Sequence, residues 1–173
     1  MRLTGYAVRK DGSIADLTVV DLSYNGCGIE CSTELSPGET IRLGVTRRGA
    51  IIADVCWYEA GKAGLIFKPE PQPNSGPVPR QSERVAVTAD VSVRRRGRHS
   101  YRVRVYDASL HGCRIEFAER PQALETLRIT FDGLAPLEAR VNWVDEQCAG
   151  LEFSNPIHPA VFELVAERLR QVA

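Results

Sequence analysis

DLSYNGCGIE at residues 21–30 and DASLHGCRIE at residues 107–116 are two versions of one ten-residue block, 86 positions apart. The same offset aligns further residues without a gap, placing Val55, Trp57, Gly64, Leu65 and Phe67 on Val141, Trp143, Gly150, Leu151 and Phe153. Self-similarity at a fixed offset indicates a duplicated structural unit. The sequence therefore predicts two tandem copies of one small domain.

A proline-rich stretch separates the two copies. Residues 69–79, PEPQPNSGPVP, contain five of the ten prolines in the chain, and such a composition is typical of an extended, semi-rigid linker. We therefore expect domains at residues 1–68 and 80–173. The copies differ at both ends, because the positions that would match Arg80 and Arg84 fall before residue 1, and only the second copy continues into a terminal segment.

Short segments with alternating apolar residues fill each copy. In the second copy VAVTADVSV (85–93), HSYRVRVYDAS (99–109) and CRIEF (113–117) alternate, and LRITFDG, LEARVNWVD and AGLEF follow after short turns. Six short strands in about 75 residues are typical of a small closed barrel. We predict an all-β protein with two tandem six-stranded antiparallel barrels.

The last 18 residues, PIHPAVFELVAERLRQVA, have a different period. Pro159 suits the first turn of a helix, and the apolar residues after it recur at helical spacing, namely Val161, Phe162, Val165, Leu169 and Val172. We therefore expect an amphipathic α-helix after the second barrel, packed across it.

Composition excludes several classes of protein. Apolar residues make up 43% of the 173 residues, which is enough for a folded core. The sequence contains no run of 18 apolar residues, the length needed for a membrane-spanning helix. The N-terminus lacks the apolar segment of a signal peptide. We expect a cytoplasmic protein that does not contact a membrane.

Cysteine and histidine usage argues against metal binding and catalysis. The five cysteines show no zinc-ligand spacing and are interpreted as small buried thiols. The three histidines stand near no candidate nucleophile at a recognisable spacing. The sequence therefore predicts a protein without a metal, without a cofactor and without enzymatic activity.

The block at 107–112 has the pattern D-x-S-x-x-G. Asp107 and Ser109 would project in the same direction if the strand continued through them, and a carboxylate can accept both edge donors of a guanine. Gly112 would permit a positive φ or a close backbone approach. The alternative interpretation is an aspartate- or serine-capped turn between two strands.

Two arginines stand where the linker enters the second copy. Arg80 and Arg84 form an R-x-x-x-R pair in a polar segment, where both side chains can converge on one ligand. A guanidinium can bind a phosphate through two hydrogen bonds or lie flat on a purine. The alternative is a solvated, basic end of the linker.

R-x-x-x-R followed by a strand, a hairpin and D-x-S-x-x-G resembles the PilZ domain family, receptors for the bacterial messenger cyclic di-GMP. The resemblance covers the second copy from Arg80 to the terminal helix. It implies that Arg80 and Arg84 bind the phosphates and guanine faces of cyclic di-GMP. It also implies that Asp107 and Ser109 bind a guanine edge and ribose, and that Gly112 lets the ligand approach.

Two further residues are secondary candidates for ligand contact. They are Arg114 and Trp143. The first copy also has a tryptophan at the matching position, Trp57, so a structural role is favoured for Trp143. The first copy has the matching acceptor residues Asp21, Ser23 and Gly26, but no arginine pair, so independent tight binding by that copy is doubtful.

We expect a receptor or adaptor that changes the geometry between its two domains when cyclic di-GMP binds, and so regulates a protein partner of unknown identity. One alternative is a nucleic-acid-binding barrel that uses the arginine-rich hairpin at residues 94–104, which the net charge of zero disfavours. Another is a scaffold in which both copies have lost ligand binding.

Overall fold

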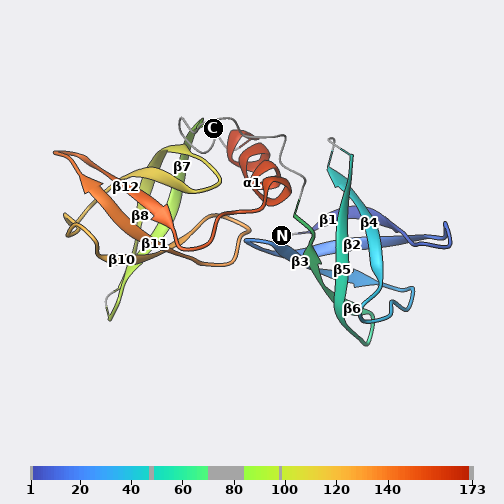
Figure 1. The fold of residues 1–173 in the computed structure, drawn as a ribbon. Helices are drawn as coiled ribbons and strands as arrows, with labels where there is room; N and C mark the ends of the chain where they lie inside the picture. Colours follow the sequence, from blue (N-terminus) through green and yellow to red (C-terminus); the bar gives the residue numbers. More distant parts are fainter. Residues whose placement is uncertain (1, 47–48, 70–83, 98, 172–173) are drawn as a thin grey trace, which may run out of the picture. The chain divides into compact units, whose positions relative to one another are not determined.

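The computed structural model describes residues 2–46, 49–69, 84–97 and 99–171. Arg80 and linker residues 70–79 lie outside the described residues. The chain divides into two compact units, Met1–Pro71 and Gln72–Ala173. The first unit is built from β1 (Leu3–Val8), β2 (Ile14–Ser23), β3 (Gly26–Cys31), β4 (Thr40–Thr46), β5 (Gly49–Glu59) and β6 (Lys62–Phe67). These strands close into an antiparallel barrel in the order β1-β2-β3-β6-β5-β4 (Figure 1).

The second unit repeats this architecture and adds a helix. Its elements are β7 (Val85–Arg95), β8 (Ser100–Ala108), β9 (Gly112–Glu116), β10 (Thr126–Thr130), β11 (Leu137–Val144), β12 (Cys148–Phe153) and α1 (Pro159–Gln171). The strands close in the order β10-β11-β12-β9-β8-β7, again antiparallel throughout. The predicted pair of six-stranded antiparallel barrels with a terminal helix is confirmed.

Alternation along the strands builds both cores. In β8, for example, Val103 and Val105 are buried inside the barrel, whereas Arg102 and Arg104 are exposed on its outer face. Because successive side chains of a strand point to opposite faces, each barrel is filled by about every second residue. The outer faces carry mostly polar groups, together with a few large apolar side chains such as Ile52, Trp57 and Trp143. Closure also leaves neither sheet with a free edge.

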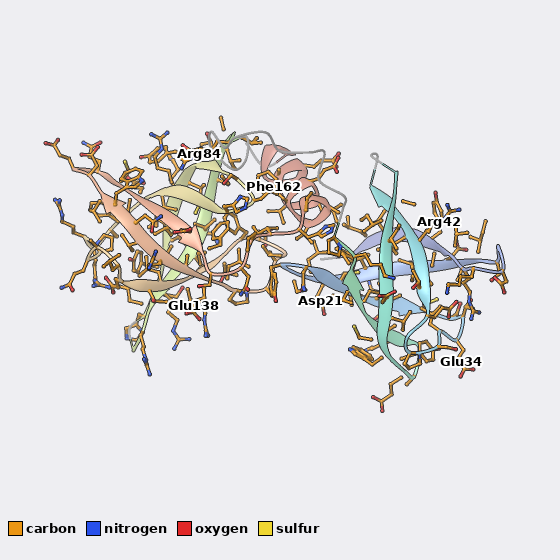
Figure 2. All side chains as sticks on the ribbon, viewed as in Figure 1. Asp21, Glu34, Arg42, Arg84, Glu138 and Phe162 are labelled. Carbon is orange, nitrogen blue, oxygen red and sulfur yellow. The ribbon has the colours of Figure 1, made fainter. Side chains whose placement is uncertain are left out.

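Helix α1 packs against β7 of its own barrel. Its first residue is Pro159, as predicted, and Val161 and Val165 are buried, whereas Phe162 is partly exposed (Figure 2). Leu164, which the predicted stripe omitted, is also buried. The side chains of residues 169 and 172, also in that stripe, lie outside the described part of the chain. Apolar residues of α1 and the barrel line a small cavity of about 10 Å³.

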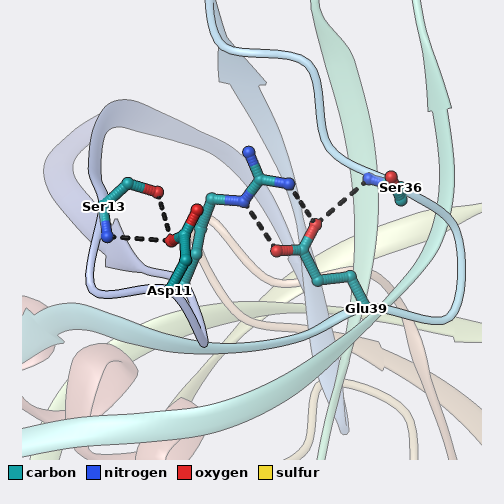
Figure 3. Close-up of polar contacts among 5 residues, drawn as sticks. Asp11, Ser13, Ser36 and Glu39 are labelled. Carbon is teal, nitrogen blue, oxygen red and sulfur yellow. Dashed lines mark hydrogen bonds and ion pairs between the residues drawn. The ribbon is translucent and has the colours of Figure 1, made fainter.

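An ion pair at one end of each barrel follows the repeat. In the first barrel Arg9 donates from Nε and Nη2 to the two carboxylate oxygens of Glu39, at 2.6 and 3.0 Å (Figure 3). In the second barrel Arg95 and Glu125, 86 residues later, make the same two contacts at 2.6 and 2.9 Å. These side chains are no more than 25% exposed, so both pairs of hydrogen bonds are largely shielded from solvent.

All five cysteines are free thiols, but they are not all buried. Cys27, Cys31 and Cys113 are buried, and burial raises the pKa of the Cys27 thiol to about 12. Cys56 is exposed, so the prediction of a buried thiol is wrong there, because its position in β5 points to the outer face. No helix in the described part of the chain is both long enough and apolar enough to cross a membrane.

Candidate functional site

The predicted site residue Asp107 lies on the outer face of the second barrel, at a bulge in β8. The bulge shifts the register between Val105 and Asp107 and sets Asp107 opposite Arg114 of β9. Arg114 is in turn opposite Gly150 of β12, and Gly150 is opposite Trp143 of β11. A cross-strand row of four residues therefore runs from a carboxylate, past a guanidinium and a glycine, to an indole.

Two arginines hold the Asp107 carboxylate. Nη1 of Arg84 donates to its Oδ1 at 3.1 Å, and Nε of Arg114 lies 2.9 Å from its Oδ2. The second contact is an ion pair without good hydrogen-bond geometry, because the buried Nε of Arg114 has no well-aligned acceptor. The guanidinium of Arg114 also lies over the ring of Tyr106, with its central carbon 5.4 Å from the ring centroid.

The electrostatic balance of this cluster favours an anion. One carboxylate faces two guanidinium groups, so the cluster carries a net positive charge. The side chain of Asp107 is only 15% exposed, whereas those of Arg84 and Arg114 are 56% and 42% exposed. Figure 2 shows Arg84 at the edge of the second barrel. Both cations can therefore reach a ligand that arrives from solvent while Asp107 stays in place.

Ser109 is occupied by the turn that follows β8. The strand ends at Ala108, so Ser109 does not continue the outward alternation of Asp107 and is only 6% exposed. Its N–H donates to the carbonyl of Gly112 at 2.8 Å, and its hydroxyl contacts the same carbonyl and the N–H of His111, each at 3.3 Å. The alternative interpretation of a serine-capped turn describes this geometry.

Gly112 is required by the approach of two strands. It begins β9 and has no left-handed φ. A Cβ atom on Gly112 would lie well under 3.0 Å from the carbonyl oxygen of Leu151 in β12. Of the two roles predicted for this glycine, the structure shows the close backbone approach. Gly26 of the first barrel has the same relation to Leu65, so the requirement comes with the fold.

The first barrel has a different partner for the matching carboxylate. Asp21 accepts a hydrogen bond from the backbone N–H of Gly28 at 2.8 Å, and Gly28 occupies the position of Arg114 in the repeat. A side chain at position 28 would collide with the Asp21 carboxylate. Only the second copy therefore combines the aspartate with an arginine from the neighbouring strand.

Trp143 has the same surroundings as its counterpart in the first copy. The indole of Trp143 covers Gly150, and the indole of Trp57 covers Gly64, so closely that neither glycine could carry a Cβ atom. This shared contact gives both tryptophans a packing role on the outer face. Trp143 is nevertheless 40% exposed and stands in the same cross-strand row as Arg114.

The structure brings Arg84, Asp107 and Arg114 together, keeps Ser109 and Gly112 in the adjacent turn, and does not describe Arg80. Tyr106 was missed by the motif analysis, although its place in the sequence immediately before Asp107 was a signal that could have identified it. Among the described residues, no group of three or more His, Cys, Asp or Glu side chains could hold a metal ion.

Comparison with known proteins gives a family and several distant structural likenesses. The model of the family described as "PilZ domain" matches residues 79–171, more than half of the chain. Bacillus subtilis MotI/DgrA, an inhibitor of motility, is 15% identical with a TM-score of 0.41, covering 98% of this chain and 96% of that one. Escherichia coli YcgR in complex with c-di-GMP is 13% identical with a TM-score of 0.40, covering 98% and 83%.

A third structure, Borreliella burgdorferi PlzA in complex with c-di-GMP, is 12% identical with a TM-score of 0.39, covering 96% of this chain and 86% of that one. No curated protein matches the sequence. The family match spans β7 to α1, including the strand and turn that carry the D-x-S-x-x-G motif. The chain belongs to the PilZ domain family.

Proposed function

We propose that this chain is a receptor for cyclic di-GMP, with a binding site formed by Arg80, Arg84, Asp107, Ser109 and Gly112. The observation that carries the proposal is the cluster of Asp107 with two partly exposed arginines, within the segment that matches the PilZ domain family. The ligand carries two phosphates and two guanines, so it offers both the anions and the paired donors that this cluster can bind.

The cluster can exchange its internal contacts for ligand contacts at low cost. Partly exposed ion pairs contribute only about 0–1 kcal/mol, so releasing Arg84 from Asp107 costs little. The freed guanidinium can bind a phosphate through two hydrogen bonds or stack on a guanine. The freed carboxylate oxygen can accept from a guanine edge.

Arg114 strengthens this site in the second copy. It holds Asp107 from the neighbouring strand, and Tyr106 lies beneath its guanidinium. We assign Arg114 the role of keeping the carboxylate oriented when Arg84 turns to the ligand. Ser109 and Gly112 fix the turn that follows, so they place Asp107 relative to β9 and β12.

We further infer that the protein is a non-enzymatic adaptor that transmits ligand binding to a protein partner. Arg80 follows directly on the linker at residues 69–79, so fixing its side chain on a phosphate would fix the direction in which the linker leaves the site. Proline-rich segments are stiff enough to pass such a constraint onward. Small-angle scattering with and without cyclic di-GMP tests whether the relative arrangement of the domains changes.

Isothermal titration with cyclic di-GMP tests the site itself. Asp107→Asn and Arg84→Ala are expected to weaken binding, since a hydrogen bond to a charged group contributes about 1.5–3 kcal/mol, or roughly 10- to 150-fold in affinity. Asp21→Asn is the matched control, because Asp21 occupies the same position in the first barrel and accepts there from the backbone N–H of Gly28, where the second barrel has Arg114.

Three results would overturn the proposal: no binding by the parent protein, unchanged binding by both second-barrel variants, or an equal loss in the Asp21→Asn control. The last result would mean that the first barrel also contributes to binding. Thermal unfolding of each variant establishes that the fold is retained before the titrations are compared.

A further inference from the structure

A second group of arginines covers another part of the outer face of the second barrel. The group, here called the arginine face, consists of five exposed side chains on β7, β8, β10 and the turn after β7: Arg94, Arg96, Arg102, Arg104 and Arg128. Arg94 of β7 stands directly opposite Arg128 of β10 in the ladder. Arg94, Arg96 and Arg128 line an open cleft of about 500 Å³.

The charges in this cleft are poorly balanced. Within the described part of the chain, the side chains of Arg94, Arg96 and Arg128 make no hydrogen bond or ion pair. The one acidic residue lining the cleft is Glu138, opposite Arg128 on β11. Like charges opposite each other on neighbouring strands destabilise a sheet. The neighbouring Arg95 differs, because Glu125 binds it through two hydrogen bonds. The cleft therefore keeps unneutralised cations at a cost in stability.

The barrel fold does not require these arginines. The first copy has the same strands and register, but the positions that match the arginine face hold a mixed set of residues: Val8, Lys10, Asp16, Thr18 and Arg42. Its single arginine, Arg42, lies opposite Val8 on β1, where the second copy has Arg94. Since the two copies share one scaffold, the additional cations of the second copy are specific to that copy.

The chemistry of the face favours phosphate groups as its ligand. Every cation is an arginine, whose planar fork can bind a phosphate through two hydrogen bonds. The large hydrophobic side chains exposed on the second barrel, Leu124 and Trp143, do not line the cleft. Protein interfaces are centred on such apolar anchors, so a protein partner is disfavoured here.

The shape of the face distinguishes between forms of nucleic acid. Single strands are bound by stacking bases on exposed aromatic rings, and the arginine face contains none of the exposed aromatic side chains of the described residues. The arginines instead follow the two antiparallel strands β7 and β8, and a two-stranded ribbon of this kind fits the major groove of a duplex. Two acidic residues border the cations: Asp90 stands opposite Arg104, and Glu138 stands opposite Arg128.

We propose that the arginine face binds the phosphate backbone of a nucleic-acid duplex, independently of base sequence. The cleft end of the face, at Arg94, Arg96 and Arg128, is separate from the Asp107 cluster, whereas Arg104 stands three residues before Asp107 on β8. Ala86, which is opposite Asp107, precedes Arg94 by eight residues along β7, a separation of roughly 25 Å. Figure 2 shows Arg84 and Glu138 on opposite sides of the second barrel. A duplex bound at the cleft end of the face therefore leaves the Asp107 cluster open to a cyclic dinucleotide.

The test is fluorescence anisotropy with the full chain, a labelled 20-base-pair duplex of arbitrary sequence and salt concentrations from 50 to 200 mM. The double variant Arg94→Ala/Arg128→Ala should lose about tenfold in affinity for each arginine at 50 mM salt. The slope of log affinity against log salt concentration should become shallower by about 2, because about two phosphate contacts are lost. Arg42→Ala, which removes the matching arginine of the first barrel, should bind the duplex like the parent protein.

Competition and a second double variant distinguish a duplex site from a general anion site. A single strand of the same length and a polyglutamate peptide should both compete poorly. Arg94→Gln/Arg128→Gln, which keeps much of the side-chain length, should repeat the loss. The alanine double variant should bind cyclic di-GMP unchanged, so failure of this proposal can be told from failure of the receptor site. The proposal is overturned if the parent does not bind the duplex, if the Arg42→Ala control loses as much as the double variant, or if polyglutamate competes as well as duplex.

Discussion

The glycine of the D-x-S-x-x-G motif can be tested in the copy that lacks the arginine cluster. In the first barrel, replacing Gly26 by alanine would place a Cβ atom well under 3.0 Å from the carbonyl oxygen of Leu65. Ordinary contacts to this atom begin near 3.4 Å, so β3 and β6 must separate locally. The contacts at risk are the Gly26–Ile66 pairing and the 2.8 Å hydrogen bond from the N–H of Phe67 to the carbonyl of Asn25.

The cost follows from these contacts. Two backbone hydrogen bonds contribute about 1 kcal/mol each, and the unpaired groups at this buried strand end add roughly another 1 kcal/mol. The alanine recovers about 0.4–1 kcal/mol through the lower entropy of the unfolded chain. We therefore expect Gly26→Ala to destabilise the first barrel by about 2 kcal/mol, or roughly 10 °C in its melting temperature.

Calorimetry of the full chain measures this change, and Gly12→Ala in the same barrel provides the control. Gly12 has a φ of +83° and no atom within 4 Å of its Cβ position, so its substitution costs only backbone strain, about 1 kcal/mol. If Gly26→Ala is no more destabilising than Gly12→Ala, then the strand contact does not explain this glycine, and a ligand role for Gly112 gains support.

Three further predictions concern the ion pair, a strained turn and the carboxylate cluster. Hydrogen bonding to Arg9 holds the pKa of Glu39 below its usual 4.5. The ion pair therefore stabilises the first barrel above pH 4.5, and this stabilisation is lost as pH falls through the pKa of the folded state. Glu39→Gln should therefore flatten the fall in stability over that pH range in an acid denaturation profile. Leu124 is 68% exposed at a strained φ of 65°, so Leu124→Gly should stabilise the second barrel by up to about 1 kcal/mol and raise its melting temperature. A lower melting temperature would refute the idea that this turn is strained. Arg114→Gly should leave the second barrel folded, because Gly28 serves there in the first, yet weaken cyclic di-GMP binding about tenfold or more in titration calorimetry; unchanged affinity would exclude the orienting role of Arg114.

The fold could be predicted because its determinants are periodic. Alternation identified the strands, as at Val103 and Val105, and the 86-residue offset showed that a second copy must fold in the same way. Pro159 marked the start of the helix. These signals depend on neighbouring positions in the chain and on burial, which a single sequence displays directly.

The side-chain geometry of the site could be predicted only in part. The motif identified Asp107, but a bulge, which sequence alternation does not register, decides that Arg114 stands opposite it. Alternation also suggested that Ser109 projects beside Asp107, whereas the strand ends one residue earlier and the serine turns inward. The pair of Arg95 with Glu125 joins residues 30 positions apart, and only the matching pair in the first copy could have revealed it.

The duplication separates what the barrel needs from what a ligand needs. Features present in both copies, such as the tryptophan over a glycine and the glycine at the start of the third strand, are accounted for by contacts within the barrel. Features confined to the second copy lack that explanation. Arg114 stands where Gly28 suffices, and Arg94 stands where the first copy has Val8. An arginine that the barrel does not need for folding lowers the stability of the barrel through charge repulsion or desolvation. An anionic ligand is the partner that would offset this loss of stability. On this reasoning we propose two anion sites on the second barrel, one at Asp107 and Arg114 and one at Arg94 and Arg128, and the first barrel serves as the internal control for testing them.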